Sequence, residues 1–160
     1  MKNYMQVVIN KCVLGCILNM GNFEKIYRCS LEVRGYELDS YGHVNHAIYI
    51  NYLEHARWKM LEDEGINLRK FKEWNRWPVI AELEIKYMKP AFAGEKLDIE
   101  THVVEHRRVA FTLQQKIFRD GLQILEARIK SVMVNENGRP SEIPHEMIRI
   151  WGPKRGKNEQ

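Results

Sequence analysis

The chain has 160 residues, 44% of them hydrophobic and 29% charged, with a formal net charge of +4. Its length is most simply that of one domain with a sizeable core, and the composition is ordinary for a soluble globular protein. The basic residues form no long run, which argues against nucleic-acid binding. The mild positive charge suits an anionic ligand such as a phosphorylated carrier. No apolar run approaches the roughly 18 residues of a membrane span.

The cysteine content indicates the compartment of the protein, and the composition of the two ends indicates the boundaries of the domain. The three cysteines, Cys12, Cys16 and Cys29, are few and odd in number, so they argue against a disulfide framework and favour a reducing cytoplasm. Residues 1–22 precede the first clear strand and are interpreted as an N-terminal extension of uncertain order. The predicted domain covers residues 23–151, and residues 152–160 form a charged tail.

The first half of the domain predicts a strand, a loop and a long helix. Apolar and polar residues alternate over 26–34, as in a half-buried strand. A loop over 36–45 follows, then a helix from His46 to Asp63 that ends near Gly65. Apolar side chains cover most of this helix and leave only a narrow polar stripe, so we expect a sheet curled around it.

The second half predicts four strands and a short helix. An aromatic-rich connection leads to Pro78, and strand-like runs cover 81–87, 97–103, 109–117 and 124–134. Asp120-Gly121 is a predicted hairpin turn, because both residues can take positive φ. A short helix is expected near Met147 and Trp151. Consecutive strands joined by tight turns pair antiparallel, so we predict an α+β layer.

The loop before the long helix carries the candidate chemistry. Asp39 stands beside the predicted helix N-terminus, where backbone N–H groups can polarise a carbonyl oxygen while the acid acts on water or on carbon. Asp39 could equally cap the following turn, a common role for a loop aspartate. Gly42 indicates a turn with positive φ or a close approach to a ligand.

Each residue that follows Asp39 can be interpreted as structural or as catalytic. His43 could be a general base or could fix the loop by hydrogen bonds, and we favour the structural role. Asn45 is the predicted N-cap, which leaves the amides of His46 and Ala47 to face an oxyanion, so His46 acts mainly through its backbone. The histidine spacing matches no metal signature, so no metal is predicted.

Four basic residues in the second half are candidates for contact with an anionic group. A solvated surface is their default interpretation, and contact with coenzyme phosphates is the alternative. They are Lys86, Lys89, Arg107 and Arg108.

One motif and the order of elements carry a family resemblance. The motif Asp-x-x-Gly-His-Val-Asn-x-x-x-Tyr comprises Asp39, Gly42, His43, Val44, Asn45 and Tyr49. Together with the order strand, loop, long helix and four strands, it resembles the 4-hydroxybenzoyl-CoA thioesterase-like branch of the hot-dog-fold acyl-CoA thioesterases. The resemblance implies a curved antiparallel sheet of about five strands wrapped around one central helix. It also implies a homodimer, or a homotetramer built from two dimers, with active sites at the subunit interface.

The implied reaction is hydrolysis of an acyl thioester. Asp39 would attack the carbonyl or activate water, the helix-terminal amides would stabilise the oxyanion, and the residues leave both routes open. CoA would bind as part of the substrate, with no separate cofactor. The acyl group would occupy an apolar slot beside the central helix. Expected substrate contacts are Gly42, Val44, Asn45, Tyr49 and Tyr52.

Two alternatives remain open at this point. One is a thioesterase acting on acyl-carrier protein, although the plant enzymes usually have Asn two residues after the acid, where this chain has Tyr41. The other is a hot-dog module that binds acyl-CoA without catalysis. Asp39 argues against this module, because a pure binder needs no carboxylate beside the thioester.

Overall fold

The computed structural model describes residues 25–152. The expected extension over residues 1–22 lies outside the described residues, as do residues 153–160 of the expected tail. The elements are β1 (Tyr27–Glu32), the 3-10 helix η1 (Gly35–Glu37), α2 (His46–Asp63), α3 (Leu68–Trp74), β2 (Trp77–Tyr87), β3 (Lys96–His106), β4 (Ala110–Arg119), β5 (Leu122–Val134) and α4 (His145–Trp151).

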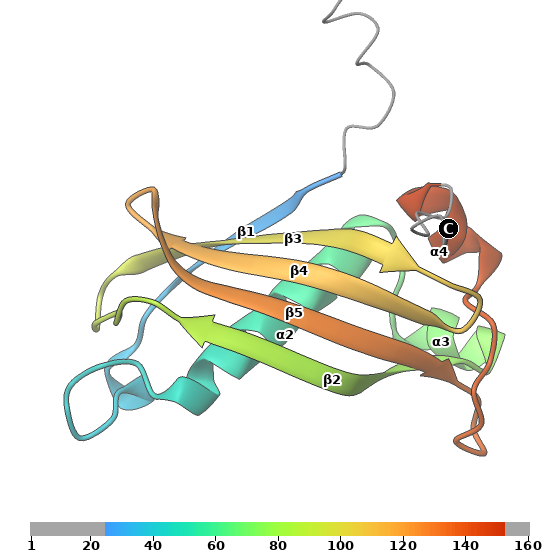
Figure 1. The fold of residues 1–160 in the computed structure, drawn as a ribbon, viewed down its shortest axis with the longest axis horizontal. Helices are drawn as coiled ribbons and strands as arrows, with labels where there is room; N and C mark the ends of the chain where they lie inside the picture. Colours follow the sequence, from blue (N-terminus) through green and yellow to red (C-terminus); the bar gives the residue numbers. More distant parts are fainter. Residues whose placement is uncertain (1–24, 153–160) are drawn as a thin grey trace, which may run out of the picture.

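A five-stranded sheet and the helix α2 form the body of the molecule. The strands lie in the order β1-β3-β4-β5-β2, and every neighbouring pair is antiparallel. The helix α2 lies across one face of this sheet (Figure 1). Fully buried side chains from β3, β4 and β5, such as Ile99, Leu113 and Ile129, form one core cluster with those of α2. The predicted α+β architecture, with a sheet around one central helix, is confirmed.

The bounds of α2 follow from local sequence, and both ends match the prediction. At the start, the Asn45 side chain accepts a hydrogen bond from the Ala47 amide at 2.9 Å, as an N-cap does. At the end, Gly65 takes a φ of 71°, which stops the helix. Its buried residues are Tyr49, Tyr52, Leu53, Ala56, Met60 and Leu61.

The position of β2 differs from the prediction that consecutive strands pair. That prediction is right for β3, β4 and β5, and Asp120 and Gly121 take the expected positive φ values of 49° and 76°. It is wrong for β2, which pairs with β5. The reason is that β1 occupies the free edge of β3, so β2 must join the opposite edge. The connection over 88–95 therefore crosses the end of the sheet beside the loop that holds Asp39.

The segment between α2 and β2 is also more ordered than expected. Residues expected to form a connection include the helix α3, which Asn67 caps by accepting from the Lys70 amide at 3.2 Å. The strand β2 begins at Trp77 and includes Pro78, which was expected to precede it. Proline fits here because β2 is an edge strand, where a backbone without an N–H costs no sheet hydrogen bond.

Residues 25–152 contain neither a helix that could span a membrane nor a cluster of metal-binding side chains. None of the helices there combines the length and the hydropathy that crossing a bilayer requires. In the same residues, no three His, Cys, Asp or Glu side chains lie close enough to share a metal ion.

Candidate functional site

The loop from Leu38 to Val44 is closed on itself. An antiparallel bridge joins Leu38 and Val44 at its base. Within the loop the Asp39 amide donates to the His43 carbonyl at 2.7 Å, and the Gly42 amide donates to the Asp39 carbonyl at 3.0 Å. Gly42 takes a φ of 78°, as predicted, and a Cβ there would meet no atom within 4 Å. The backbone conformation, and not crowding within the chain, therefore selects glycine.

The two oxygens of the Asp39 carboxylate have different surroundings. Oδ1 accepts hydrogen bonds from the amides of Tyr41, at 2.9 Å, and His43, at 3.2 Å. No donor within residues 25–152 bonds to Oδ2. The structural interpretation of Asp39 therefore applies to one oxygen, and the other is available to a substrate or a water molecule.

The amides at the start of α2 differ from the expectation in one respect. The Ala47 amide was expected to face an oxyanion, but it donates to the Asn45 cap and is not free. The neighbouring amides of Val44, Asn45 and Ile48 bond to backbone carbonyls. Over residues 44–48, only the His46 amide has no acceptor in the described part of the chain. One donor thus remains at the helix N-terminus.

A cleft of about 340 Å³ lies where the loop, the first turn of α2 and the end of β2 meet. Tyr87 of β2 closes one side, where its hydroxyl donates to the His46 carbonyl at 3.1 Å and its ring lies 5.7 Å from that of Tyr49. The lining residues are Asp39, His43, Val44, His46, Tyr49, Tyr87, Met88, Lys89 and Pro90. Six of these were sequence candidates. Sequence reasoning missed Tyr87, Met88 and Pro90, because β2 reaches the loop only through tertiary pairing.

The imidazole of His43 packs against the 88–95 connection. Its ring centroid lies 5.2 Å from that of Phe92, at an interplanar angle of 82°. The structural role favoured from sequence was to fix the loop by hydrogen bonds. Within residues 25–152 the His43 side chain makes this edge-to-face ring contact and no hydrogen bond.

Tyr52 lies outside the cleft, in a buried hydrogen-bond network centred on Glu37, which precedes the loop. Its hydroxyl donates to Oε2 of Glu37 at 2.5 Å, and the Arg34 amide donates to the same oxygen at 2.7 Å. Burial raises the pKa of Glu37, but the hydrogen bonds from Tyr52 and Arg34 outweigh it and hold the pKa below its usual value. The Glu37 carbonyl also accepts from the Asn45 amide at 2.9 Å. Sequence reasoning missed Glu37, whose only local signal is its position three residues after Arg34.

The four basic candidates do not gather at the cleft. Lys89 lines it, whereas the exposed Lys86 pairs in register with Glu126 of β5. Arg107 and Arg108 follow β3, at the end of the sheet opposite the Asp39 loop (Figure 1). There they form ion pairs with Glu105 at 2.9 Å and Glu142 at 3.2 Å, respectively. Within one copy of the chain, the arginines are not brought to Asp39.

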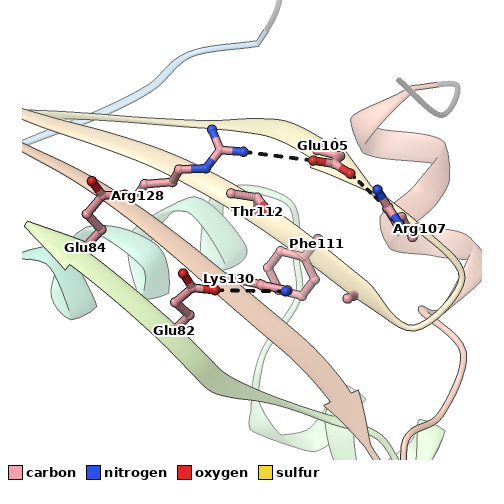
Figure 2. A pocket seen from close by; sticks show the side chains of 9 residues that line it. Glu82, Glu84, Glu105, Arg107, Phe111, Thr112, Arg128 and Lys130 are labelled. Carbon is pink, nitrogen blue, oxygen red and sulfur yellow. Dashed lines mark hydrogen bonds and ion pairs between the residues drawn. The ribbon is translucent and has the colours of Figure 1, made fainter. Parts of the chain in front are cut away.

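A second hollow, of about 320 Å³, lies on the sheet face that points away from α2 (Figure 2). Its acidic and basic side chains balance, and ion pairs join Arg107 to Glu105 and Lys130 to Glu82. Such exposed pairs contribute little to stability. The lining residues are Glu82, Glu84, Glu105, Arg107, Ala110, Phe111, Thr112, Arg128 and Lys130. Without an excess of positive charge, this hollow has no evident affinity for phosphate groups.

Comparisons with known proteins agree with the fold and identify the family. A family model described as the thioesterase-like superfamily matches residues 33–151. The chain is 33% identical over 135 residues to the acyl-acyl carrier protein thioesterase ATL2 of Arabidopsis thaliana, covering 83% of this chain and 70% of that protein. It is 32% identical over 107 residues to the long-chain acyl-CoA thioesterase FadM of Escherichia coli, covering 66% and 80%.

Among solved structures, a hypothetical protein from Aquifex aeolicus matches with a TM-score of 0.73 and 29% identity, over 80% of this chain and 99% of that one. The family model covers well over half of the chain, and the architecture is that of a hot-dog fold. The chain therefore belongs to the thioesterase-like superfamily of thioester hydrolases.

Proposed function

We propose that the chain hydrolyses acyl-CoA thioesters in the cleft at Asp39. The observation that carries this proposal is that one cleft holds Oδ2 of Asp39 and the His46 amide, neither of which has a hydrogen-bond partner within residues 25–152. The thioester carbonyl oxygen accepts a hydrogen bond from the His46 amide, which stabilises the negative charge that develops there, and the helix dipole adds to this effect. Oδ2 of Asp39 supplies the electron pair for the reaction.

Two routes use the same oxygen. In the first, Oδ2 attacks the carbonyl carbon, the C–S bond breaks, and the CoA thiolate departs. The acyl group then forms a mixed anhydride with Asp39, which water hydrolyses. In the second, Oδ2 takes a proton from water while the water oxygen attacks the carbonyl carbon. Each route consumes one water molecule and yields the free acid and CoA thiol.

Hydrolysis of acyl-acyl carrier protein is the second candidate function. Two observations support it: the similarity to the Arabidopsis protein ATL2, and a net charge of +4 that suits an acidic carrier. The two candidates share the chemistry at Asp39 and differ in the carrier that delivers the acyl group.

The direct test measures thiol release from a panel of short, medium, long and aromatic acyl-CoAs and from acyl-carrier protein. We expect Asp39→Asn to lower kcat/KM by about 100- to 10,000-fold, because the neutral amide can neither attack nor take a proton. Asp120→Asn is the matched control, since it makes the same change in the β4–β5 turn, at a positive φ that Asn tolerates. Undiminished hydrolysis by Asp39→Asn would refute the site assignment. Tight acyl-CoA binding by the unaltered chain without turnover would favour a binding module.

We further propose that the chain works as a homodimer joined along β2. As an edge strand, β2 has backbone groups on one side that no strand in residues 25–152 pairs. Its exposed apolar side chains include Val79, Ile80, Leu83 and Tyr87. If β2 of a second copy paired with this edge, it would continue the sheet. The second copy would then lie beside the cleft, because Tyr87 belongs to β2 and also lines the cleft. A tetramer and a cytoplasmic location stay predictions.

A further inference from the structure

The loop that carries Asp39 begins and ends at one hydrogen-bonded pair, Glu37 and Asn45, which we call the loop neck. Glu37 precedes the loop, Asn45 follows it, and the Asn45 amide donates to the Glu37 carbonyl at 2.9 Å. Asn45 is also the N-cap of α2, directly before His46. The loop neck therefore connects the two parts of the proposed site, the Asp39 loop and the helix N-terminus.

The side chain of Glu37 attaches the loop neck to the body of α2. Its Oε2 accepts hydrogen bonds from the Tyr52 hydroxyl at 2.5 Å and from the Arg34 amide at 2.7 Å. Tyr52 lies in the second turn of α2. Its hydroxyl can reach back to the loop neck because side chains on a helix lean toward the N-terminus. One carboxylate thus joins the segment before the loop to the helix after it.

Glu37 is an unusual residue for a buried contact, because burial of a charge is unfavourable unless hydrogen bonds compensate for it. Burial raises the pKa of Glu37, but the hydrogen bonds from Tyr52 and Arg34 outweigh it and keep the carboxyl ionised at neutral pH. An ionised carboxylate accepts charge-assisted hydrogen bonds, which are shorter and stronger than neutral ones. They are also directional, so they fix the loop neck on the helix in one arrangement, which an apolar contact would not do.

The two proposed reacting groups lie on opposite sides of this attachment. Asp39 moves with the loop, because its Oδ1 is bonded to the amides of Tyr41 and His43. The His46 amide moves with α2, whose first residue it is. The separation between Oδ2 of Asp39 and the His46 amide therefore depends on how the loop is attached to the helix. A misplacement of about 1 Å can lower a rate about 100-fold.

We propose that Glu37 is a positioning residue: its carboxylate holds the Asp39 loop on α2 and thereby sets the distance between Oδ2 of Asp39 and the His46 amide. This inference rests on the proposed thioesterase function. Glu37 does not line the cleft, so it makes no contact with a thioester bound there. Its loss should therefore lower kcat and leave KM nearly unchanged, because the alignment of the reacting groups is lost while the substrate contacts remain.

Steady-state kinetics of three variants test this role, at a temperature where circular dichroism shows each variant to be folded. We expect Glu37→Ala to lower kcat by about 10- to 100-fold and to change KM by less than about twofold. Glu37→Gln should retain most of kcat, because its amide oxygen can accept both hydrogen bonds of Oε2. Tyr52→Phe should lower kcat by about three- to tenfold. A raised KM with an unchanged kcat in Glu37→Ala overturns the proposal.

The double variant shows whether Glu37 acts through Tyr52. Adding Tyr52→Phe to Glu37→Ala should lower kcat little further, because the hydrogen bond between the two side chains is already lost. Two effects that multiply would mean that the residues act independently, and would overturn the proposal. If Glu37→Ala does not fold, Tyr52→Phe decides alone, and an unchanged kcat in that variant overturns the proposal.

Thr101→Val is the matched control for the loss of a buried hydrogen bond. The Thr101 hydroxyl oxygen accepts from Nε2 of Gln115 at 2.8 Å, within the sheet, and neither residue lines the cleft. The variant should lower the midpoint of thermal unfolding and leave kcat unchanged. An equal loss of kcat in Thr101→Val and in Glu37→Ala would mean that any loosening of the core slows the reaction, and would overturn the positioning role.

Amide hydrogen exchange, followed by NMR, measures the attachment of the loop without any turnover. Glu37→Ala should accelerate exchange at the amides of Tyr41, His43 and Asn45, whose hydrogen bonds lie in the loop and the loop neck. Thr101→Val should leave these three amides unchanged. Unchanged exchange in Glu37→Ala overturns the proposal.

These outcomes separate the positioning role from the proposed function. If Asp39→Asn hydrolyses thioesters as well as the unaltered chain does, the site assignment is wrong, whatever the Glu37 variants show. If Asp39→Asn is inactive and Glu37→Ala retains full kcat, the site stands and the positioning role fails. Exchange at the loop amides tests the attachment by Glu37 even if no thioester is hydrolysed.

Discussion

Glu37 is a buried carboxylate two residues before Asp39, with an exposed fraction of 5%. Its pKa is held below the usual value, so Glu37 stabilises the fold above its unfolded pKa of about 4.3, and this contribution is lost as the pH falls through the lower folded pKa. We expect Glu37→Gln to reduce the free energy of unfolding at pH 7 and to weaken its decline toward acid pH.

Glu37→Ala should lower the free energy of unfolding more than Glu37→Gln does, because it leaves the Tyr52 hydroxyl and the Arg34 amide without their acceptor. Each buried unsatisfied group costs about 1–3 kcal/mol. Denaturant unfolding at pH 7 and pH 4 measures both variants. Glu62→Gln, on the exposed side of α2, is the control and should change little. An identical pH dependence for Glu37→Gln and the unaltered chain would contradict this prediction.

Substitution of Gly42 can distinguish an effect on stability from an effect on catalytic activity. Alanine at its φ of 78° meets no atom, so Gly42→Ala should cost about 1–2 kcal/mol from backbone conformation alone. Gly138→Ala, at a φ of 70° in the turn after β5, should cost the same. Only Gly42→Ala should lower kcat/KM, by about tenfold to a hundredfold, because its loop positions Asp39. Equal activity of the two variants at equal stability would show that the loop tolerates displacement.

At this scale, sequence reasoning succeeded for structural features that depend on a few neighbouring residues. Asp39, Gly42 and Asn45 fall within seven residues, and their roles as loop acid, positive-φ turn and N-cap follow from residue type and order. The Ala47 amide was assigned wrongly, because the cap that was predicted also uses the donor that was expected to be free. Tyr87 could not be found from sequence, since only the pairing of β2 with β5 brings it to the loop.

At the scale of elements, the N-terminus of α2 combines a structural cap with the proposed oxyanion donor. Asn45→Ala should cost about 1 kcal/mol, because the Ala47 amide loses its acceptor. Asn45→Asp keeps the cap and should keep the stability. Its negative charge, however, would lie beside the oxygen that becomes negative in the transition state, so kcat should fall.

Thermal unfolding and steady-state kinetics of the Asn45 variants test this separation. The matched control is Asn67→Asp, which makes the same change at the cap of α3, away from the cleft. It should affect neither stability nor kcat. If Asn45→Asp retained full kcat, the oxyanion would not lie at the start of α2, and the His46 amide would lose its proposed role.

The long helix and two of the strand pairings, β3 with β4 and β4 with β5, could be predicted, because their signals lie within short stretches of chain. Asn45 and Gly65 mark the ends of α2, and the Asp120-Gly121 turn fixes β4 against β5. The edge position of β2 could not be predicted, because it depends on which edge β1 leaves open. That position sets the end of β2 beside the cleft and leaves the outer edge of β2 without a paired strand within residues 25–152.

At the scale of the whole molecule, the exposed β2 edge predicts dimerisation. Val79, in β2, has an exposed fraction of 49%, and Leu122, at the start of β5, has 51%. Val79→Lys should raise the dimer dissociation constant by about tenfold or more, because an ammonium loses hydration at a closed edge. Leu122→Lys should leave it unchanged. Sedimentation velocity over a dilution series measures both variants.

The same dilution series, followed by thiol release, tests whether the cleft needs the second copy. If the site is completed at the interface, the specific activity of Val79→Lys should fall as the dimer dissociates and recover at high protein concentration. A monomer with full activity at every dilution would show that one chain holds the whole site. The arginines at the far end of the sheet would then have no route to Asp39. In a dimer, by contrast, antiparallel pairing of two β2 strands would set the end of one sheet that carries Arg108 closer to the cleft of the other copy. Arg108, which does not line the charge-balanced hollow, would then be available to the substrate, so Arg108→Ala should raise KM for acyl-CoA only while the dimer persists.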